Sequence, residues 1–246
     1  MNEPAPSARY QRVLVKLSGE ILGGRGGTGF DADSVDRICD ELIQAVSRGV
    51  KVAVVVGGGN FFRGGRSVGL PISRTRGDQI GMLCTVINAL AIEQALQSKG
   101  ANAVVQSTVA VPSMVQHYDG VSFASFLERN FIVVFAGGTG NALLTTDTAA
   151  SLRAVDMGAD VLLKATKVDG VYSEAPGENT ETPPYERISY DKVMEHQLEV
   201  MDLAAISVCR QYGMPIRVFN AWKEGAIARV CAGANEGTLV SAEESS

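Results

Sequence analysis

Short runs of β-branched residues alternate with longer helical patterns along most of the chain. The run Val52–Val56 (VAVVV) is typical of a strand that is covered on both faces. Stretches with helical spacing of apolar residues separate such runs, and glycines end several of these stretches. Because strands separated by helices favour right-handed βαβ units, the pattern predicts an α/β fold with a mainly parallel sheet.

The sequence predicts strands at Arg12–Leu17, Val52–Val56, Ala103–Gln106, Phe131–Phe135, Val161–Leu163 and Ile216–Phe219. It predicts helices at Ser34–Arg48, Asp78–Lys99, Thr146–Met157 and Glu199–Tyr212. No repeat or linker divides the chain, so we expect a single domain over residues 1–246. Residues 1–9 and 241–246 are expected to form flexible tails, and the polar segment Ser173–Pro184 a surface loop.

Charge and cysteine usage exclude several classes of protein. Lys and Arg total 22 against 27 Asp and Glu, and this net charge of −5 disfavours general binding of nucleic acid or anionic membranes. The four cysteines form no C-x-x-C pair, which favours buried thiols in a reducing cytosol over a zinc site or disulfides. The N-terminal segment lacks an apolar core, and the stretch Gln79–Ile92 is shorter than the ~20 residues that span a bilayer. We therefore expect a cytoplasmic protein.

Three glycine clusters follow directly after predicted strands. They are Ser18-Gly19, Gly57-Gly58-Gly59 and Gly137-Gly138-Thr139-Gly140. In a parallel α/β sheet, ligands bind outside the carboxyl ends of the strands. Glycine turns at that edge offer free N–H groups and close backbone approach, which suit phosphate oxygens. The alternative is that these glycines only make tight turns.

Cationic side chains accompany the glycine clusters. Lys16 ends the first strand, and a lysine in an apolar strand is costly to bury without an anionic partner. Arg63 follows the triple glycine, and Lys164 closes the strand Val161–Leu163. The alternatives are a lysine that extends to solvent, an exposed loop arginine, and a solvated pair of Lys164 with Lys167.

Two carboxylates lie at predicted helix starts. Asp147 falls in the first turn of one helix, and Asp78 opens the long one. Each is a candidate site residue. The alternative is that it only caps its helix or complements the helix dipole. His117 and His196 neighbour no glycine cluster, so we expect surface or core histidines.

Common nucleotide-binding motifs are largely missing. The chain has no G-x-x-x-x-G-K-[ST] loop and neither the H-R-D nor the D-F-G motif of protein kinases. The segment Gly24–Gly29 matches G-x-G-x-x-G. It lies several residues past the first strand and opens no helix immediately, so it only weakly indicates a dinucleotide site.

Five segments in this order carry a family resemblance: Lys16–Glu20 (KLSGE), Gly57–Gly64 (GGGNFFRG), Gly77–Asp78, Thr139–Asp147 (TGNALLTTD) and Lys164–Gly170 (KATKVDG). Together they resemble the bacterial uridylate (UMP) kinases of the amino acid kinase family, over residues ~10 to ~240. The resemblance implies a three-layer α/β/α sandwich. It implies phosphoryl transfer from ATP with Mg²⁺ to UMP, giving UDP and ADP in de novo pyrimidine nucleotide biosynthesis. It also implies a homohexamer that GTP activates and UTP inhibits.

The resemblance further implies roles for individual residues. The implied ATP-binding residues are Lys16, Leu17, Ser18, Gly19, Gly59, Arg63, Thr166 and Tyr172. The implied UMP-binding residues are Gly58, Asp78, Thr139, Gly140, Asn141, Ala142, Leu143, Leu144, Thr145 and Thr146. The segment linked to GTP activation comprises Gly24, Arg25, Gly26, Gly27, Thr28 and Gly29.

The charge of UMP indicates a mechanism. Its phosphate has a second pKa near ~6, so the attacking oxygen is ionised at neutral pH and needs no general base. Catalysis then consists of positioning and charge neutralisation. We expect Lys16 and Arg63 to hold the transferring phosphoryl oxygens and Asp147 to orient Lys16 or magnesium. The sequence identifies no metal ligands.

Other functions remain open at this point. A kinase of an amino acid, carbamate or another small acid on the same fold would also need no base. A non-catalytic nucleotide sensor or storage protein is a second alternative, and a dehydrogenase, which would depend on Gly24–Gly29 alone, is a third.

Overall fold

The computed structural model describes residues 9–63, 71–173 and 182–242. Most of the predicted tails and the middle of the predicted loop Ser173–Pro184 lie outside these ranges.

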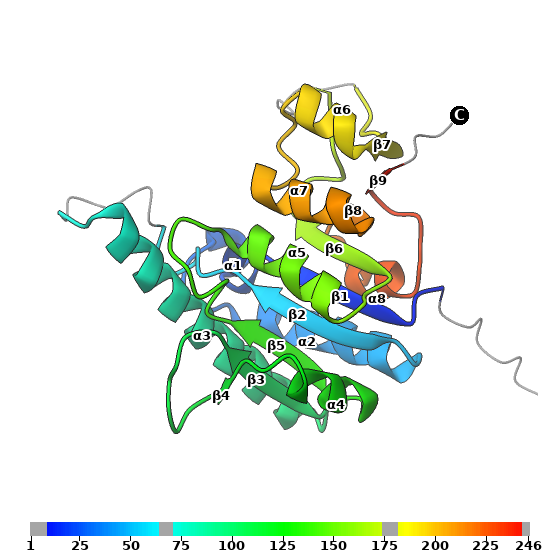
Figure 1. Cartoon of the computed structure of the whole chain (residues 1–246). Helices are drawn as coiled ribbons and strands as arrows, with labels where there is room; N and C mark the ends of the chain where they lie inside the picture. Colours follow the sequence, from blue (N-terminus) through cyan, green and yellow to red (C-terminus); the bar gives the residue numbers. More distant parts are fainter. Residues whose placement is uncertain (1–8, 64–70, 174–181, 243–246) are drawn as a thin grey trace, which may run out of the picture.

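A nine-stranded sheet runs through the described residues in the order β4-β3-β5-β2-β1-β6-β8-β9-β7 (Figure 1). Its strands are β1 (Arg12–Leu17), β2 (Lys51–Val56), β3 (Ala103–Ser107), β4 (Gln116–His117), β5 (Ile132–Ala136), β6 (Val161–Thr166), β7 (Arg187–Ser189), β8 (Ile216–Asn220) and β9 (Thr238–Ser241). Neighbouring strands pair in parallel, except for the antiparallel pair β8 and β9. The expected mainly parallel sheet is confirmed.

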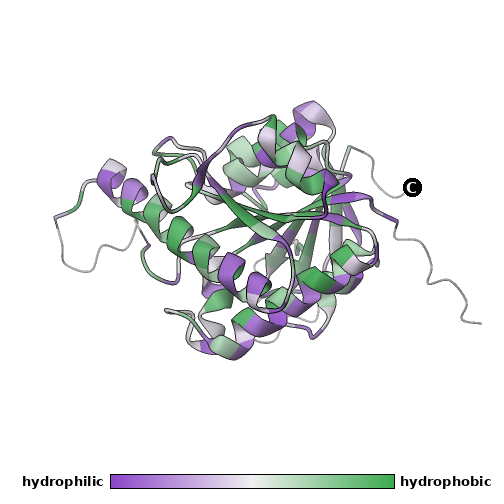
Figure 2. Cartoon of the chain, turned by 90° about the horizontal axis from the view of Figure 1, so that it is seen from below, coloured by the Kyte–Doolittle hydropathy of each residue, from purple (hydrophilic) through white to green (hydrophobic). Residues whose placement is uncertain are grey.

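Helices cover both faces of this sheet. They are α1 (Gly19–Leu22), α2 (Ala32–Ser47), α3 (Arg74–Ser98), α4 (Ser122–Glu128), α5 (Thr146–Asp156), α6 (Tyr190–Glu195), α7 (Leu203–Tyr212) and α8 (Ala226–Cys231), with a 3₁₀ turn at Gly24–Gly26. The helices α2, α3 and α8 pack into one apolar cluster, and α4, α5, α6 and α7 into another. Figure 2 shows the apolar strands between the two helical layers. The three-layer α/β/α sandwich is therefore confirmed.

Side-chain alternation along the strands builds both layers. In β1, Val13 and Val15 enter the cluster under α2 and α3, while Leu14 enters the one under α5. All three are fully buried, which explains why the strand reads as a continuous apolar run.

Three helices begin elsewhere than predicted. The helix α2 starts at Ala32, two residues before the predicted Ser34, because Asp31 caps it through a 2.8 Å bond from Ser34 N. The helix α3 starts at Arg74, because the side chain of Ser73 accepts a hydrogen bond from Arg76 N and caps it. The expectation that Asp78 opens this helix is wrong, since Asp78 lies one turn inside it. The helix α7 starts at Leu203 and not at Glu199, because Asp202 caps it through a 3.0 Å bond from Ala205 N.

By length and composition, α3 could cross a membrane, the one such helix in the described part of the chain. However, Ile92 and Leu96 are fully buried and pack into the core beneath the sheet. The length and apolar character of α3 therefore reflect its place in the core and do not indicate a membrane protein.

Candidate active site

The glycine turns meet at one edge because β5, β2 and β1 are neighbours in the sheet. Gly57 N donates to Leu17 O at 2.9 Å, which joins the turns after β1 and β2. A Cβ at Gly19 would lie 2.5 Å from Asn60 Oδ1 and 2.6 Å from Gly57 O, closer than side chains pack. Position 19 therefore requires glycine for the two turns to touch.

The third turn joins the same edge through Gly137. Its N–H donates to the buried Oγ1 of Thr85 on α3 at 2.8 Å. Gly137 has φ +78°, and a Cβ there would lie 2.5 Å from Thr108 Oγ1. Glycine is thus required both for the left-handed backbone and for the contact with Thr108.

One carboxylate bridges two lysines from neighbouring strands. Lys16 Nζ lies 2.8 Å from Asp147 Oδ1, and Lys164 Nζ donates to Asp147 Oδ2 at 2.7 Å. The three side chains are 11 to 15% exposed. The alternative of a solvated pair of Lys164 with Lys167 is not what the structure shows, because Lys164 is held by Asp147.

Burial and charge act in opposite directions on this cluster. Burial alone would raise the pKa of Asp147, but Lys16 and Lys164 outweigh it, and the pKa lies below its ordinary value. Burial lowers the pKa of Lys164 below its ordinary value although Asp147 opposes the shift. Asp147 is therefore an anion that holds two cations, and its lowered pKa makes it a weak base for abstracting a proton.

The start of α5 positions Asp147. Thr145 caps this helix, since its Oγ1 accepts from Asp147 N at 3.0 Å and from Thr148 N at 3.4 Å. Asp202 accepts in turn from Thr148 Oγ1 at 3.0 Å and from Thr145 Oγ1. The capping role weighed for Asp147 thus belongs to Thr145, which leaves the Asp147 carboxylate for the lysines.

A cavity of about 420 Å³ opens on one side of this cluster. It is lined by Gly58, Gly59, Phe62, Arg63, Arg74, Gly77, Asp78, Gly81, Met82, Thr85, Gly138, Leu143, Leu144, Thr145 and Thr146. Six of the ten residues implied to bind UMP are among them. Thr139, Gly140, Asn141 and Ala142 are not, and lie farther along the same loop.

Asp78 fixes the loop that closes this larger cavity. Its Oδ2 accepts from Leu143 N at 2.9 Å. Leu143 has φ +72°, a conformation that leucine rarely adopts, and the residue is 64% exposed. The bond to Asp78 therefore helps to hold a strained backbone at the wall of the cavity.

A cavity of about 250 Å³ opens on the other side, lined by Lys16, Ser18, Glu20, Ile21, Lys164, Ala165, Thr166, Lys167 and Trp222. Three residues of the implied ATP set, Lys16, Ser18 and Thr166, line it. Leu17 and Gly19 are buried beside it in the first glycine turn, and Gly59 and Arg63 line the larger cavity.

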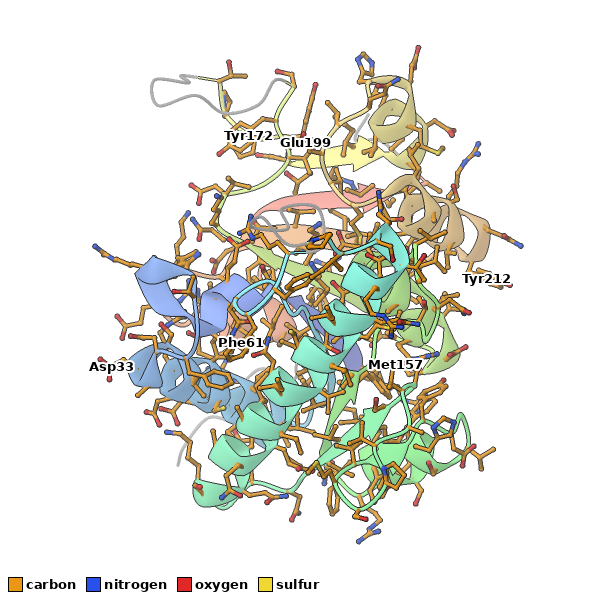
Figure 3. All side chains as sticks on the ribbon, turned by 90° about the vertical axis from the view of Figure 1, so that its left-hand side faces the viewer. Asp33, Phe61, Met157, Tyr172, Glu199 and Tyr212 are labelled. Carbon is orange, nitrogen blue, oxygen red and sulfur yellow. The ribbon has the colours of Figure 1, made fainter. Side chains whose placement is uncertain are left out.

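Tyr172 lines neither cavity. Figure 3 views the molecule from the side toward which β2 and β5 run in Figure 1, and labels Phe61 near the centre and Tyr172 near the top. The structure thus brings most of the implied ATP set to the glycine edge, and leaves Tyr172 apart from it.

An ion pair joins the two cavities. Arg63, from the larger cavity, binds Glu20, from the smaller one. Both side chains are partly exposed, so the pair is accessible to a ligand.

The segment Gly24–Gly29 contacts the second glycine turn. Gly29 N donates to Asn60 O at 3.0 Å, and Asn60 Nδ2 donates to Gly29 O at 2.8 Å. Asn60 also exchanges bonds with the buried Asn88 of α3, which donates to Gly57 O at 2.6 Å. A polar network therefore ties this segment to the site edge.

The sequence did not predict a role at the site for five of these residues: Glu20, Thr85, Asn88, Asp202 and Trp222. Thr85 and Asn88 had a visible signal, because they are polar residues inside an apolar helical stretch. Asp202 directly precedes a helix, so the sequence indicates a cap, and it does cap α7. Nothing in the sequence indicates that it also bonds to α5.

Metal ligands and thiols do not gather here. Within the described residues, no three His, Cys, Asp or Glu side chains could hold an ion together. His117 and His196 are exposed and lie outside both cavities, as expected. The four cysteines are free and buried, which confirms the expectation for them.

Comparisons with known proteins agree with this geometry. The model of the amino acid kinase family matches residues 11–220. A uridylate kinase of Serratia proteamaculans (strain 568) is 48% identical over 232 residues, which cover 94% of this chain and 96% of that protein. One of Yersinia enterocolitica (strain NCTC 13174 / 8081) is 47% identical over 234 residues, which cover 95% and 94%.

Solved structures resemble the fold over nearly its whole length. The crystal structure of UMP kinase from Bacillus anthracis has a TM-score of 0.91 at 34% identity and covers 96% of this chain and 97% of its own. That of UMP kinase from Ureaplasma parvum has a TM-score of 0.88 at 31% identity, with 95% and 99% covered.

Proposed function

The chain belongs to the amino acid kinase family, and on that premise we propose that it transfers a phosphoryl group from ATP to UMP, giving UDP and ADP. This reaction belongs to pyrimidine nucleotide biosynthesis. The observation that carries the proposal is the pair of cavities on either side of the Lys16–Asp147–Lys164 cluster. Relatives named uridylate kinase support the choice of acceptor.

Each cavity has one substrate in this proposal. ATP occupies the smaller one, where Lys16 and Ser18 face its phosphates and Trp222 offers an aromatic surface to its base. UMP occupies the larger one, bounded by Gly58, Asp78 and the loop up to Thr146. The glycine N–H groups between them bind phosphate oxygens of both nucleotides.

The acceptor needs no general base. A nucleoside monophosphate is largely a dianion at neutral pH, since its second pKa is near ~6. Both described histidines lie away from the cavities, and Asp147 is already paired with two ammonium groups. The site therefore acts by positioning two anions in line and by neutralising their charge.

The cationic side chains share that task. Lys16 and Lys164 approach the transferring phosphoryl group from neighbouring strands, with Asp147 fixing both ammonium groups. Arg63 exchanges Glu20 for phosphate oxygens when the nucleotides bind. Such donors are effective because they are already oriented before the charge develops.

Mg²⁺ fits this site as a companion of ATP. In nucleotide sites it is usually held by phosphate oxygens, water and one or two carboxylates. Glu20 lines the smaller cavity, and Asp147 is the carboxylate of the neighbouring cluster, so both are candidate contacts. The bound ion would neutralise charge on the phosphates.

The decisive experiment measures ADP formation with ATP, Mg²⁺ and a panel of acceptors: UMP, CMP, dTMP, aspartate and carbamate. We expect UMP to be preferred by a wide margin, because a buried site that pairs the base edge rejects a base with a donor and acceptor exchanged. Equal turnover of CMP would reject the uridylate assignment. Preference for a small acid would favour the alternative kinase, and no turnover would favour a nucleotide sensor.

Assembly and regulation are further parts of the proposal. The chain forms a homohexamer in the cytoplasm, activated by GTP and inhibited by UTP. The bonds between Gly29 and Asn60 support a route from the segment Gly24–Gly29 to the second glycine turn.

A further inference from the structure

A third cavity, lined mostly by polar residues, lies at the edge of the sheet formed by β8, β9 and β7. Its volume is about 350 Å³, and it is lined by Arg9, Glu186, Arg187, Arg217, Asn235, Gly237 and Leu239. None of these residues lines either cavity of the proposed active site.

Three neighbouring strands build its floor. Arg217 on β8 pairs with Leu239 on β9, and Leu239 pairs with Arg187 on β7. These side chains form one row on the same face of the sheet. Arg217 alternates with Val218, which packs into the cluster beneath α5 and α7. The row therefore lies on the face opposite to α5, which carries Asp147.

Arg217 is a buried cation that forms no ion pair with the described residues. Its residue is 4% exposed, and its Nε has no hydrogen-bond partner among the described residues. The other nitrogens make long bonds to neutral oxygens, 3.3 Å to Glu236 O and 3.4 Å to Asn235 Oδ1. The Glu236 carboxylate is paired with Arg229. A buried guanidinium in this state gains strongly from a negatively charged ligand.

Two further guanidinium groups face the same space. Arg187 is exposed, and its side chain forms neither a hydrogen bond nor an ion pair with the described part of the chain. Arg9 donates one bond, to Asn235 Oδ1 at 3.3 Å. Glu186 is the one carboxylate in the lining, so three cations stand against one anion.

We propose that this cavity is a binding site for a small phosphate-bearing ligand, held by Arg217, Arg187 and Arg9. Guanidinium groups match phosphate oxygens in pairs, and a phosphate carries close to two charges where a carboxylate carries one. Leu239 is the single apolar side chain in the lining, and no aromatic residue is present there. The cavity therefore suits a sugar phosphate or a diphosphate and offers a nucleobase no stacking surface.

Calorimetric titration of the whole chain with pyrophosphate tests this site. We expect Arg187→Ala to weaken one binding component by roughly tenfold or more, because a charge-assisted contact is lost. Arg48→Ala is the matched control, since Arg48 is exposed at the end of α2 and its side chain has no partner among the described residues. It should bind like the wild type. UMP phosphorylation by Arg187→Ala without pyrophosphate should equal that of the wild type, which verifies its fold.

Three results would overturn the proposal. The first is that Arg187→Ala and Arg48→Ala bind pyrophosphate equally strongly, and the second is that the wild type does not bind pyrophosphate at all. The third is that citrate binds more tightly than pyrophosphate and that Arg187→Ala loses citrate binding, which would make the ligand a carboxylate. None of these results depends on which acceptor the enzyme phosphorylates, so the two proposals can fail separately.

Discussion

At the scale of single residues, the candidate site depends on one carboxylate that serves two ammonium groups. Asp147 is largely buried, and Lys16 and Lys164 lie 2.8 and 2.7 Å from its two oxygens. Removing either lysine leaves the carboxylate one partner, whereas removing the carboxylate leaves two neighbouring cations with none. The two kinds of substitution should therefore differ in their effects.

Replacing Lys16 tests the chemistry. We expect Lys16→Ala to lower turnover at least ~100-fold, as the loss of an oriented donor does in comparable sites. The chain should stay folded, because Asp147 keeps Lys164. Steady-state kinetics and circular dichroism measure both effects. Lys51→Ala is a matched control, since Lys51 starts β2 and pairs with Glu128 outside both cavities. Near-normal turnover of Lys16→Ala would remove Lys16 from the mechanism.

Replacing Asp147 tests the electrostatics. We expect Asp147→Asn to lower the free energy of unfolding by about 3–5 kcal/mol near neutral pH, as breaking a buried ion pair does. The folded-state pKa of Asp147 is lowered, so its stabilisation is complete above the unfolded value of ~3.9 and is lost as the pH falls through the folded value. The gap between wild type and variant should then close at acidic pH.

Denaturant unfolding across the acidic range measures this gap. Asp191→Asn is the control, because Asp191 forms an exposed pair with Arg210 and should contribute at most ~1 kcal/mol. A gap that stays constant from neutral to strongly acidic pH would contradict the charge assignment.

The sequence predicted the charged members of the cluster but not all of their partners. Lys16 and Asp147 were identifiable because each stands beside a glycine turn or a helix start. The pairing of Lys164 was not, because strand neighbours depend on the order of β1 and β6 in the sheet, which no local pattern specifies. The reciprocal bonds of Asn60 and Asn88, 28 positions apart, were hidden for the same reason.

At the scale of elements, the glycine turns set how closely the strands' ends can approach. Gly19→Ala places a methyl group against Gly57 O and Asn60 Oδ1 and should separate the first two turns. We expect a loss of about 1–3 kcal/mol in unfolding free energy, typical of overpacking, and a raised KM for ATP. Thermal unfolding and kinetics measure the two effects.

Gly120→Ala is the control for this substitution. A Cβ at Gly120 would meet its nearest neighbour, the hydroxyl of Tyr118, at 3.9 Å, which is ordinary contact. If Gly19→Ala matched Gly120→Ala in stability and kinetics, the two turns would not need to touch.

Strands were easier to predict than helix starts. The ends of β1 and β2 could be predicted from their apolar runs, because these runs stop where the chain leaves the core. The caps of α3 and α7, Ser73 and Asp202, lie in polar stretches where several residues could serve. The short strands β7 and β9 had no periodic pattern and formed only through pairing with each other and with β8.

At the scale of the whole molecule, the helix α3 carries two exposed apolar side chains close together. Leu83 and Ile87 are 49% and 47% exposed and lie one turn apart on α3. If the chain is a hexamer, light scattering should give a particle six times its 25.9 kDa mass. We expect Leu83→Asp combined with Ile87→Asp to lower that mass, because the paired charges cannot be buried between copies.

Gln94→Asp, an exposed polar position on the same helix, should leave the particle mass unchanged. A monomeric wild type at micromolar concentration would rule out the hexamer. An unaltered mass in the double variant would place the contact between copies on another surface.

The hydrogen bond from Leu143 N to Asp78 makes the Leu143 amide a probe of whether the larger cavity is occupied. The amide proton of Leu143 is held by the very carboxylate that the proposal assigns to the nucleotide. When an incoming ribose or base competes for that oxygen, the proton is released to solvent or held more firmly by a closed loop. Deuterium uptake at the Leu143 amide should thus change when the nucleotide occupies the larger cavity. It would report binding separately from phosphoryl transfer.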